Sequence, residues 1–461
     1  MYDIIIIGSG PGGYVAGIRA AQLGLKCAIV EKSELGGVCL NWGCIPTKAL
    51  LKSVQAMHYA LHSAEYGFEA GEVVPDLSAI VSRSRGVAES MSRGVDFLLR
   101  KNKVEVIRGT GRLSGKGRVE VVADDGAKTL LEAPHIVIAT GSRPNSLPFA
   151  PIDGKKIISY RQALVPGSLP ASMAIIGSGA IGSEFAFFYR SLGVEVFLIE
   201  YLGSVVPLED DDVSAQLSRS FRKMGIKVHT SANVKSVDTS GDVCKITVQT
   251  KKGEEVIEAQ VVLSAVGVIP NTDNLGLEEL GVVTERGRIK VDEYYRTSTD
   301  GLYAIGDVIP TPALAHVASA EAVCCIEKIA GLDPHPINYE NIPACTYTSP
   351  EIASVGMTER AVKELGIEYS VGKFPFTASG KATASGERDG FVKLIADKTS
   401  DQLLGAHLVG ANVTEMISGI VVARNLGAGI KDILRSIHPH PTMSEAIMEA
   451  AAAVHSESIH I

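Results

Sequence analysis

The feature that most constrains this chain is a strand–turn–helix–strand unit that occurs twice. In the first copy, four isoleucines at residues 4–7 lead into a glycine-rich turn, a helical pattern that ends at Gly24, and a second strand that ends on Glu31. In the second copy, the turn begins at Gly177 and the second strand ends on Glu200. A β-branched run followed by glycines is typical of a buried parallel strand entering a tight turn. Each copy therefore predicts a βαβ unit.

Three glycines recur at matching positions of the two turns, and each position has a physical task. The first allows the tight turn, the second lets the backbone approach a pyrophosphate, and the third permits close packing of helix on strand. The helix start then offers free N–H groups to phosphates. One glycine-rich turn is weak support because such turns can be purely structural, but two complete units predict two dinucleotide sites. The predicted cofactor-binding glycines are Gly8, Gly10, Gly13, Gly177, Gly179 and Gly182.

An acidic residue ends the second strand of each unit, where it can accept hydrogen bonds from ribose hydroxyls. These residues are Glu31 and Glu200, at the same spacing from their turns. Residues 201–204 contain no Arg or Lys that could receive a 2′-phosphate, and Glu200 would repel one. We therefore expect FAD and a pyridine nucleotide as the two cofactors, with NAD preferred to NADP. The competing interpretation of Glu200 is a solvated charge at a strand end.

The composition excludes several other classes of protein. Of the 461 residues, 46% are hydrophobic and 21% are charged, so large cores can form and disorder is excluded. The net charge of −8, without a basic stripe, argues against nucleic acid, and no apolar run approaches the roughly 18 residues of a membrane span. Seven cysteines are too few for a disulfide scaffold, and residues 1–3 show no leader. We expect a cytoplasmic protein without membrane association.

Proline-rich stretches divide the chain. The prolines between residues 143 and 151 predict a linker, and further breaks are expected at residues 268–271 and 333–336. Residues 52–100 have helical apolar spacing and are interpreted as packing elements. Beyond residue 343, strand-like runs such as residues 391–395 precede helical stretches.

Two cysteines, Cys39 and Cys44, follow directly on the first unit. In an ideal helix, residues five apart are about 7.5 Å apart along the axis and on different faces, too far apart for a disulfide. If the two pair, Cys39 must lie in a loop or a distorted first turn, and Cys44 near a helix start that favours its thiolate. A zinc site would need a second cysteine pair of metal spacing, so no metal is expected. The remaining cysteines are interpreted as inert buried residues: Cys27, Cys244, Cys324, Cys325 and Cys345.

Two histidines, His438 and His440, lie near the C-terminus with Glu445 close behind. Thiol–disulfide exchange needs a base because the thiolate is the nucleophile, and a histidine oriented by a carboxylate suits that role. Two structural alternatives stay open. Thr442 with Glu445 is a capping-box pattern, and the histidines could be loop residues between prolines.

Residues 36–48, Gly-Gly-Val-Cys-Leu-Asn-Trp-Gly-Cys-Ile-Pro-Thr-Lys, resemble the redox segment of the class I pyridine nucleotide-disulfide oxidoreductase family, above all of its members that oxidise dihydrolipoamide. The resemblance covers essentially the whole chain. It implies that Cys39 is the interchange thiol and that Cys44 is the thiolate against the flavin. It also implies that Lys48 lies near the reactive edge of the flavin and that Glu184 pairs with Lys48.

The same resemblance selects His440 as the catalytic base with Glu445 as its partner. In this family the segment completes the active site of the other subunit, so a homodimer is implied, and the His440–Pro441 bond is expected to be cis. Residues 138–144, 265–271 and 301–307 resemble further cofactor-binding stretches of the family. The additional FAD or NAD contacts that the resemblance implies are Thr140, Gly141, Ser142, Gly267, Asp307 and Ala315, with Gly111 and Val234 as weaker assignments.

The predicted fold class is α/β, with two Rossmann-like domains that bind FAD and NAD plus a C-terminal α+β dimerisation domain. The expected boundaries are residues 1–147 for the first part of the FAD domain, 148–270 for the NAD domain, 271–343 for the second part of the FAD domain and 344–461 for the dimerisation domain.

The resemblance implies oxidation of protein-bound dihydrolipoamide with reduction of NAD⁺. The expected partners are a lipoyl domain of an acyltransferase core or a glycine cleavage H protein. The main alternative is a related NAD(P)H-dependent disulfide reductase similar to glutathione reductase. A nucleotide-binding sensor would not need Cys39, Cys44 and His440 together, and a nucleotide-free thiol-exchange chaperone would not need the two glycine-rich turns.

Overall fold

The computed structural model describes residues 1–461, which form two compact units. Each unit is assembled from three segments that are far apart in the sequence. The first unit contains residues 1–50, 76–145 and 267–337, and the second contains residues 51–75, 146–266 and 338–461.

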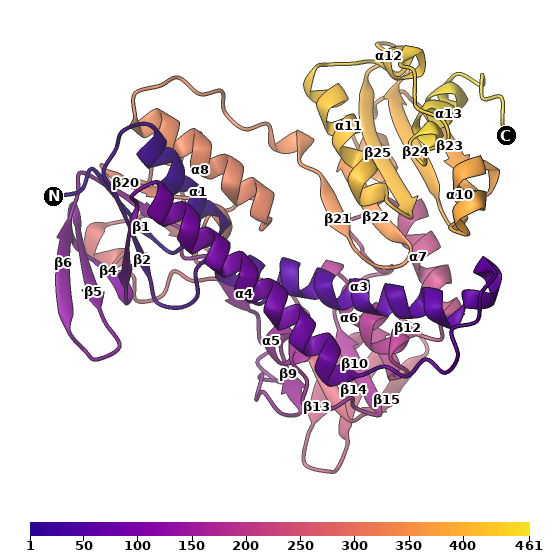
Figure 1. The fold of residues 1–461 in the computed structure, drawn as a ribbon, viewed down its shortest axis with the longest axis horizontal. Coiled ribbons are helices and arrows are strands. Elements are labelled where there is room, and N and C mark those ends of the chain that lie inside the picture. Colours follow the sequence, from indigo (N-terminus) through magenta and orange to yellow (C-terminus); the bar gives the residue numbers. More distant parts are fainter. The chain divides into compact units, whose positions relative to one another are not determined.

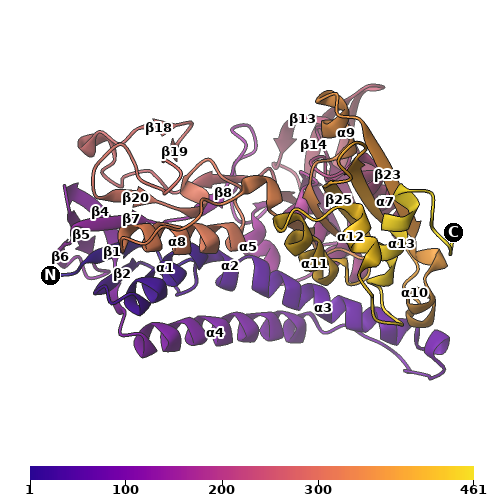
Figure 2. The same ribbon diagram turned by 90° about the horizontal axis from the view of Figure 1, so that it is seen from above.

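The core of the first unit is a parallel sheet in the order β20-β7-β1-β2-β3, of which Figure 1 labels β20, β1 and β2. The isoleucines of the central strand β1 are almost completely buried, as expected for a strand covered on both faces. Helices α1 (Pro11–Gln22) and α8 (Ala315–Ile329) lie side by side next to this sheet (Figure 1, Figure 2). The strands are β1 (Ile4–Ile7), β2 (Cys27–Glu31), β3 (Glu105–Arg108), β7 (His135–Ile138) and β20 (Leu302–Ala304).

Smaller elements complete the first unit. Strands β4 (Thr110–Gly115), β5 (Arg118–Val122) and β6 (Lys128–Glu132) form an antiparallel meander. Helix α2 (Gly37–Asn41) and the start of α3 (Cys44–Leu61) follow β2. The long helix α4 (Leu77–Lys101) is capped by Asp76, whose side chain accepts a hydrogen bond from the Ala79 N–H.

The second unit contains a parallel sheet of the same design, in the order β12-β11-β10-β16-β9. A three-stranded antiparallel meander is inserted between β12 and β16, as β4–β6 are between β3 and β7, so the repeat seen in the sequence extends to the meander. The sheet strands are β9 (Ile157–Ile158), β10 (Ser172–Ile176), β11 (Glu195–Ile199), β12 (Lys227–His229) and β16 (Val261–Ser264). The meander is β13 (Asn233–Asp238), β14 (Cys244–Thr250) and β15 (Gly253–Ala259), and the helices are α5 (Tyr160–Leu164), α6 (Ala180–Ser191) and α7 (Asp211–Lys223).

The C-terminal part of the second unit is an antiparallel sheet in the order β21-β22-β25-β24-β23. Helix α11 (Val413–Asn425) packs on β22 and β25, whereas α13 (Glu445–Val454) packs on β23 and β24. The strands are β21 (Ala344–Thr346), β22 (Glu351–Gly356), β23 (Tyr369–Pro375), β24 (Phe391–Asp397) and β25 (Leu403–Gly410). The shorter helices are α9 (Glu359–Glu364), α10 (Gly380–Ser385) and α12 (Ile430–Arg435).

The predicted fold class is confirmed: two Rossmann-like parallel sheets precede an antiparallel C-terminal domain with helices. The predicted domain boundaries stay a prediction, although the sheet built from β1, β2, β3, β7 and β20 is interrupted in sequence by the whole second parallel sheet. No helix has both the length and the apolar character needed to cross a membrane.

Two local predictions need correction. The predicted linker and the predicted break at residues 268–271 are partly strand, because β8 (Ser142–Pro144) pairs antiparallel with β17 (Val268–Pro270). The chain therefore leaves the first unit and returns to it through one small ribbon. Residues 52–100 are not continuously helical: α3 ends at Leu61, and α4 begins only after a stretch with two glycines of positive φ and Pro75.

Candidate active site

The first glycine-rich turn joins β1 to α1 and has the three predicted properties. Gly8 has a φ of +102°, and a Cβ there would lie 2.3 Å from the carbonyl oxygen of Ala139. A Cβ on Gly13 would lie 1.9 Å from the carbonyl oxygen of Gly8, so helix and strand pack too closely for a side chain. A Cβ on Gly10 would meet nothing within 4 Å. The backbone at Gly10 is thus open to a ligand at the start of a helix, which fits the pyrophosphate of FAD.

The second turn, between β10 and α6, reproduces this geometry. Gly177 has a φ of +101°, and a Cβ on Gly182 would lie 1.9 Å from the carbonyl oxygen of Gly177. The space around Gly179 is open, as it is around Gly10. The donor set and the open cradle therefore fit a second dinucleotide.

The acid at the end of each second strand is tied to its glycine-rich turn. Glu31 Oε2 accepts hydrogen bonds from Ser9 N (2.8 Å) and Ser9 Oγ (2.6 Å). Glu200 Oε2 accepts the equivalent bonds from Ser178 N (2.9 Å) and Ser178 Oγ (2.7 Å). Both carboxylates are more than 90% buried, so Glu200 is not a solvated strand-end charge. These bonds fix each acid at the switch point of its sheet, where a ribose is expected to bind.

Cys39 and Cys44 lie on two different helices. Cys39 is within α2 and Cys44 is the first residue of α3, with Trp42 and Gly43 between the helices. The predicted helix start at Cys44 is confirmed, whereas the loop or distorted turn predicted for Cys39 is wrong because a separate short helix carries it. The break between the helices allows the approach of two thiols that a single ideal helix would keep apart.

The thiols of the pair interact directly. A hydrogen bond with Cys44, together with burial and the charge of the Cys44 thiolate, raises the pKa of Cys39, and the positive charge of Lys48 acts in the opposite direction. Cys44 is the exposed member of the pair and lies at the positive end of α3, which favours its thiolate. Lys48 therefore faces the cysteine pair from the next turn of α3.

The pairing predicted between Lys48 and Glu184 stays a prediction, because the two residues belong to different units. Within its own unit, Glu184 of α6 is buried and accepts a hydrogen bond from Tyr347 N at 3.0 Å. This bond joins α6, the helix after the second glycine-rich turn, to the segment that follows β21.

Several predicted FAD contacts meet at the carboxyl ends of neighbouring strands. Thr140, Gly141 and Ser142 follow β7, and Asp307 follows β20, which pairs with β7. Ser142 Oγ donates to Asp307 Oδ2 at 2.5 Å. Carboxyl ends of parallel strands are where open α/β sheets bind ligands, so the position supports the predicted role of Asp307.

The other predicted cofactor contacts, including the two weaker assignments Gly111 and Val234, lie in more varied surroundings. Gly267 has a φ of +95° with open space around it, and Ala315 is the first residue of α8. Gly111 is buried on β4, where a Cβ would approach Val30 to 3.1 Å. Val234 is part of the hydrophobic core around the second meander. The contacts of these four residues with cofactors stay predictions.

His440 and Glu445 are in direct contact. His440 Nδ1 lies 2.9 Å from Glu445 Oε1, and the predicted cis bond between His440 and Pro441 is present. Glu445 Oε2 accepts a hydrogen bond from Thr442 N at 2.8 Å. Helix α13 starts at Glu445 with Ser444 as its cap, so Thr442 is not a capping residue. Burial opposes ionisation of Glu445, but the Thr442 N–H and the His440 ring outweigh it and lower the pKa of Glu445.

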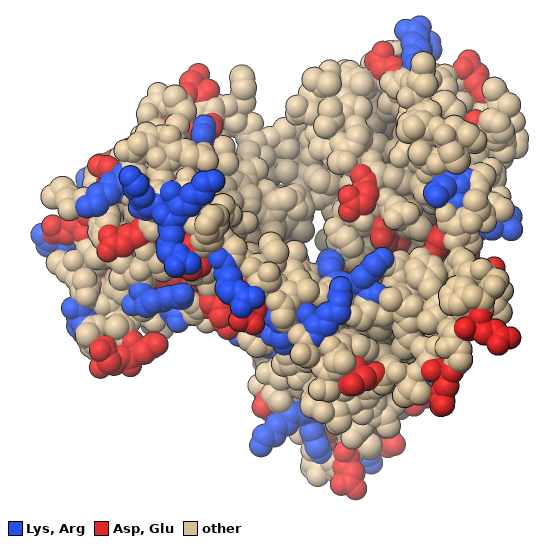
Figure 3. All heavy atoms as spheres, in the orientation of Figure 1, with Lys and Arg blue, Asp and Glu red and all other residues tan.

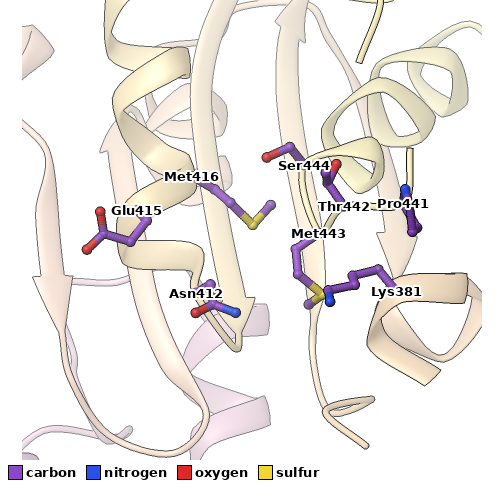
Figure 4. A pocket seen from close by; sticks show the side chains of 8 residues that line it. All are labelled: Lys381, Asn412, Glu415, Met416, Pro441, Thr442, Met443 and Ser444. Atoms are coloured by element: carbon purple, nitrogen blue, oxygen red, sulfur yellow. The ribbon is translucent and has the colours of Figure 1, made fainter. Parts of the chain in front are cut away.

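The His440 ring is strongly exposed, with 78% of its side-chain surface accessible. An open cavity of about 300 Å³ adjoins the same segment (Figure 4). Figure 4 shows residues from the start of α11 on one side and residues 441–444 on the other. The residues that line the cavity are Lys381, Asn412, Glu415, Met416, Pro441, Thr442, Met443 and Ser444.

Sequence reasoning missed two groups of residues around the first site. Glu321 of α8 is fully buried and accepts a hydrogen bond from Gly306 N at 2.6 Å, which fixes the turn beside Asp307. The available signal was an acid within the apolar run of residues 317–326. Arg85 of α4 contacts Asn41 and Trp42 between the cysteines, and no local pattern predicts this contact.

The surface charge is mixed. The face drawn in Figure 3 carries Lys and Arg side chains beside Asp and Glu side chains on both units. This interspersed pattern agrees with the modest net charge of −8 and gives that face no uniformly basic field.

Two family models match the chain. The model for pyridine nucleotide-disulphide oxidoreductases matches residues 2–322, and the model for the dimerisation domain of the same oxidoreductases matches residues 342–451. The two matches together span the glycine-rich turns, the cysteine pair and the His440 segment.

Curated relatives match over nearly the full length. The chain is 49% identical to the dihydrolipoyl dehydrogenase of Rhizobium etli, covering 97% of each chain. It is 47% identical to the dihydrolipoyl dehydrogenase of Zymomonas mobilis, covering 100% of this chain and 99% of the relative. Among solved structures, LpdA from Mycobacterium tuberculosis has a TM-score of 0.91 at 29% identity, covering 98% of this chain and 99% of that one.

Proposed function

Because this chain belongs to the pyridine nucleotide-disulfide oxidoreductase family, we propose that it oxidises protein-bound dihydrolipoamide and passes the electrons through Cys39 and Cys44 to FAD and then to NAD⁺. One observation carries this proposal. The segment that leads into α2 packs against the first glycine-rich turn so closely that a Cβ on Gly37 would lie 2.7 Å from Gly10 Cα. A thiol pair is thereby joined to a dinucleotide-binding turn.

The roles of the two cysteines in this proposal are those that the family resemblance implies. A substrate thiolate attacks the sulfur of Cys39 in the oxidised pair, forms a mixed disulfide and displaces Cys44 as a thiolate. The second substrate thiolate then attacks the mixed disulfide and displaces Cys39. The substrate leaves as a cyclic disulfide, and the reduced cysteine pair holds the two electrons that the substrate has lost. The positive end of α3 and the charge of Lys48 stabilise the anion on this pair. FAD, which the turn at residues 8–13, Glu31 and Asp307 would hold, would supply a two-electron acceptor for the pair and a hydride donor for NAD⁺.

His440 takes up one of the two protons that the substrate thiols release, and the displaced Cys39 thiolate takes up the other. Its Nδ1 is held by Glu445, so Nε2 is free to face a thiol, and the carboxylate stabilises the imidazolium that forms. The ring is exposed within its own chain. This exposure suits a group that completes the site of a second subunit.

The matched dimerisation domain supports a homodimer. For the macromolecular substrate we propose a lipoyl domain of an acyltransferase core or a glycine cleavage H protein, because relatives at 47–49% identity are dihydrolipoyl dehydrogenases. The chain itself carries two glycine-rich turns, a cysteine pair and a terminal histidine with its acid.

The alternative, an NADPH-dependent reductase similar to glutathione reductase, would have to place a 2′-phosphate beside Glu200. Both Glu200 oxygens already accept hydrogen bonds, Oε2 from Ser178 and Oε1 from Leu202 N at 2.8 Å. A phosphate there would meet a buried carboxylate with no Arg or Lys in residues 201–204.

Nucleotide preference provides the test of this proposal. The purified protein is expected to be yellow and to reduce NAD⁺ with dihydrolipoamide at a kcat/KM on the order of 100-fold above that for NADP⁺, since juxtaposed like charges cost several kcal/mol. The measurement is the rate of absorbance increase at 340 nm with each nucleotide. A colourless protein, or a preference for NADP⁺, would contradict the proposal.

The His440–Glu445 pair gives a second prediction. Glu445→Gln keeps the size of the side chain but removes the charge that stabilises the imidazolium. We therefore expect kcat/KM for dihydrolipoamide to fall about 10- to 100-fold, which is part of the roughly 10²- to 10⁴-fold rate enhancement that a positioned base contributes. Glu457→Gln, an exposed acid beyond α13, is the matched control and should retain full activity. Equal activity of the two variants would show that Glu445 does not assist the base.

A further inference from the structure

Only Trp42 and Gly43 separate the two helices that carry the cysteine pair. A short joint that contains glycine has little stiffness of its own. Helix α2 is also short and has no side-chain cap at its start. Beyond the hydrogen bonds within the segment, such as Trp42 N to Val38 O, contacts with the rest of the first unit restrain the separation of the two thiols.

Arg85 of helix α4 makes two of those contacts. Its Nη1 donates a hydrogen bond to the carbonyl oxygen of Asn41, the last residue of α2. Its guanidinium carbon lies 4.2 Å from the centroid of the Trp42 ring, within the range of a cation–π contact. Trp42 Nε1 in turn donates to Glu34 Oε1 at 3.3 Å. One planar cation thus holds the end of α2 and the first residue of the joint.

The residues next to Arg85 hold α3 in the same way. Ser84 Oγ donates to the carbonyl oxygen of Pro46 at 2.8 Å, and Arg83 Nη1 donates to the carbonyl oxygen of Ala49 at 2.7 Å. Ser84 is completely buried. Residues 83–85 of α4 therefore bond to one carbonyl of α2 and two carbonyls of α3, so both cysteine-bearing helices are anchored to one long helix.

We propose that Arg85 is a positioning residue for the redox pair: by holding Asn41 and Trp42 it keeps the Cys39 and Cys44 thiols within bonding reach and so stabilises their disulfide relative to the dithiol. This inference rests on the proposed redox role of the pair. Arg85 does not need to touch substrate or cofactor, because it acts through the backbone of α2 and the ring of Trp42.

The physical effect is one of effective concentration. A disulfide closes more favourably when one thiol is held beside the other. When the dithiol pair exchanges with oxidised dithiothreitol, the protein forms one S–S bond, and the two electrons and two protons reduce the cyclic disulfide of the reagent. The equilibrium constant of this exchange therefore measures how well the protein positions its two thiols.

The experiment compares FAD-containing wild-type protein with Arg85→Met and Arg93→Met in mixtures of reduced and oxidised dithiothreitol. Thiols are trapped and counted at each ratio. For Arg85→Met we expect the constant for disulfide formation to fall about tenfold, which corresponds to a potential about 30 mV more positive for a two-electron couple. Arg93→Met removes an exposed arginine of the same helix, paired with Glu89, and should leave the constant unchanged.

Two further measurements separate positioning from a general loss of structure. Arg85→Lys keeps the charge but cannot bond to Asn41 and cover the ring with one planar group, so an intermediate shift is expected. Trp42 is the single tryptophan of the chain, so its emission reports this joint alone and should move to longer wavelength in Arg85→Met.

The experiment distinguishes a failure of the positioning role of Arg85 from a failure of the proposed redox function of the cysteine pair. An Arg85→Met protein with the same exchange constant as Arg93→Met overturns the positioning role. A wild-type protein that gains no pair of titratable thiols on reduction overturns the proposed function of Cys39 and Cys44 itself, and with it this inference.

Discussion

Replacing Cys44 by serine is expected to abolish turnover of dihydrolipoamide while FAD stays bound at the wild-type ratio. Serine cannot form the disulfide with Cys39, so the substrate has no sulfur–sulfur bond to attack. The groups expected to hold FAD, which are the turn at residues 8–13, Glu31 and Asp307, do not include the Cys44 side chain. We expect kcat to fall by at least about 10³-fold, as for removal of a nucleophile elsewhere.

The measurements are NADH production from dihydrolipoamide and flavin absorbance per protein chain. Cys244→Ala is the control, because Cys244 is fully buried in the core around the second meander and has no thiol partner. That variant should retain turnover within about twofold. Full lipoamide turnover by Cys44→Ser would refute the disulfide relay, and loss of flavin would assign Cys44 a structural role instead.

Replacing Lys393 by methionine is expected to destabilise the second unit by about 3–5 kcal/mol, the usual cost of leaving buried charges without their partner. Lys393 is only 2% exposed on β24. Its Nζ lies 2.7 Å from Asp210 Oδ1, 2.7 Å from Glu359 Oε2 and 3.1 Å from Asp212 Oδ2. This one ammonium joins the cap of α7 to the start of α9 and to the C-terminal sheet.

Urea unfolding followed by circular dichroism measures this effect. Lys245→Met is the control, since the Lys245 side chain is exposed on β14 and pairs with Glu258 only at 3.9 Å. The control should change the free energy of unfolding by less than about 1 kcal/mol. A Lys393→Met protein as stable as the control would mean that the buried cluster contributes nothing net.

The same cluster predicts how stability depends on pH. Burial alone would raise the pKa of Glu359, but hydrogen bonds from Lys363, Lys393 and Tyr369 lower it to about 2. Hydrogen bonds from Lys393 likewise lower the pKa of Asp210 and Asp212 against burial. A lowered carboxyl pKa stabilises the fold above the unfolded pKa, and this contribution is lost as the pH falls through the folded value. Wild-type stability should therefore drop between about pH 4.5 and pH 2, and Lys393→Met should lose much of that dependence.

Much of the candidate site could be predicted because its signals are local. The third glycine of each turn meets a steric demand within a few residues, because a Cβ on Gly13 or Gly182 would collide with the carbonyl oxygen of the glycine five residues earlier. The acid after each second strand follows from the length of one βαβ unit. The start of α3 at Cys44 also follows from nearby glycines and the helical pattern behind them.

The contacts that the sequence could not provide join segments with no shared pattern. Arg85 reaches Asn41 across 44 residues, Asp307 meets Ser142 across 165, and Lys393 meets Asp210 across 183. The sequence also did not predict that a separate helix, α2, carries Cys39. The conformation of α2 is fixed by its packing on Gly10 and α4 rather than by its own residues.

The sequence by itself determined the duplicated dinucleotide units, the cysteine pair and the terminal histidine with its acid, because these depend on spacing along a single chain segment. Only the tertiary structure decided that Glu31 and Glu200 are locked to their turns, that two helices bring the thiols together, and that α4 holds both of those helices. The physical reason is range: backbone sterics and hydrogen-bond periodicity act over a few residues, whereas burial and charge pairing depend on which distant segments pack against one another.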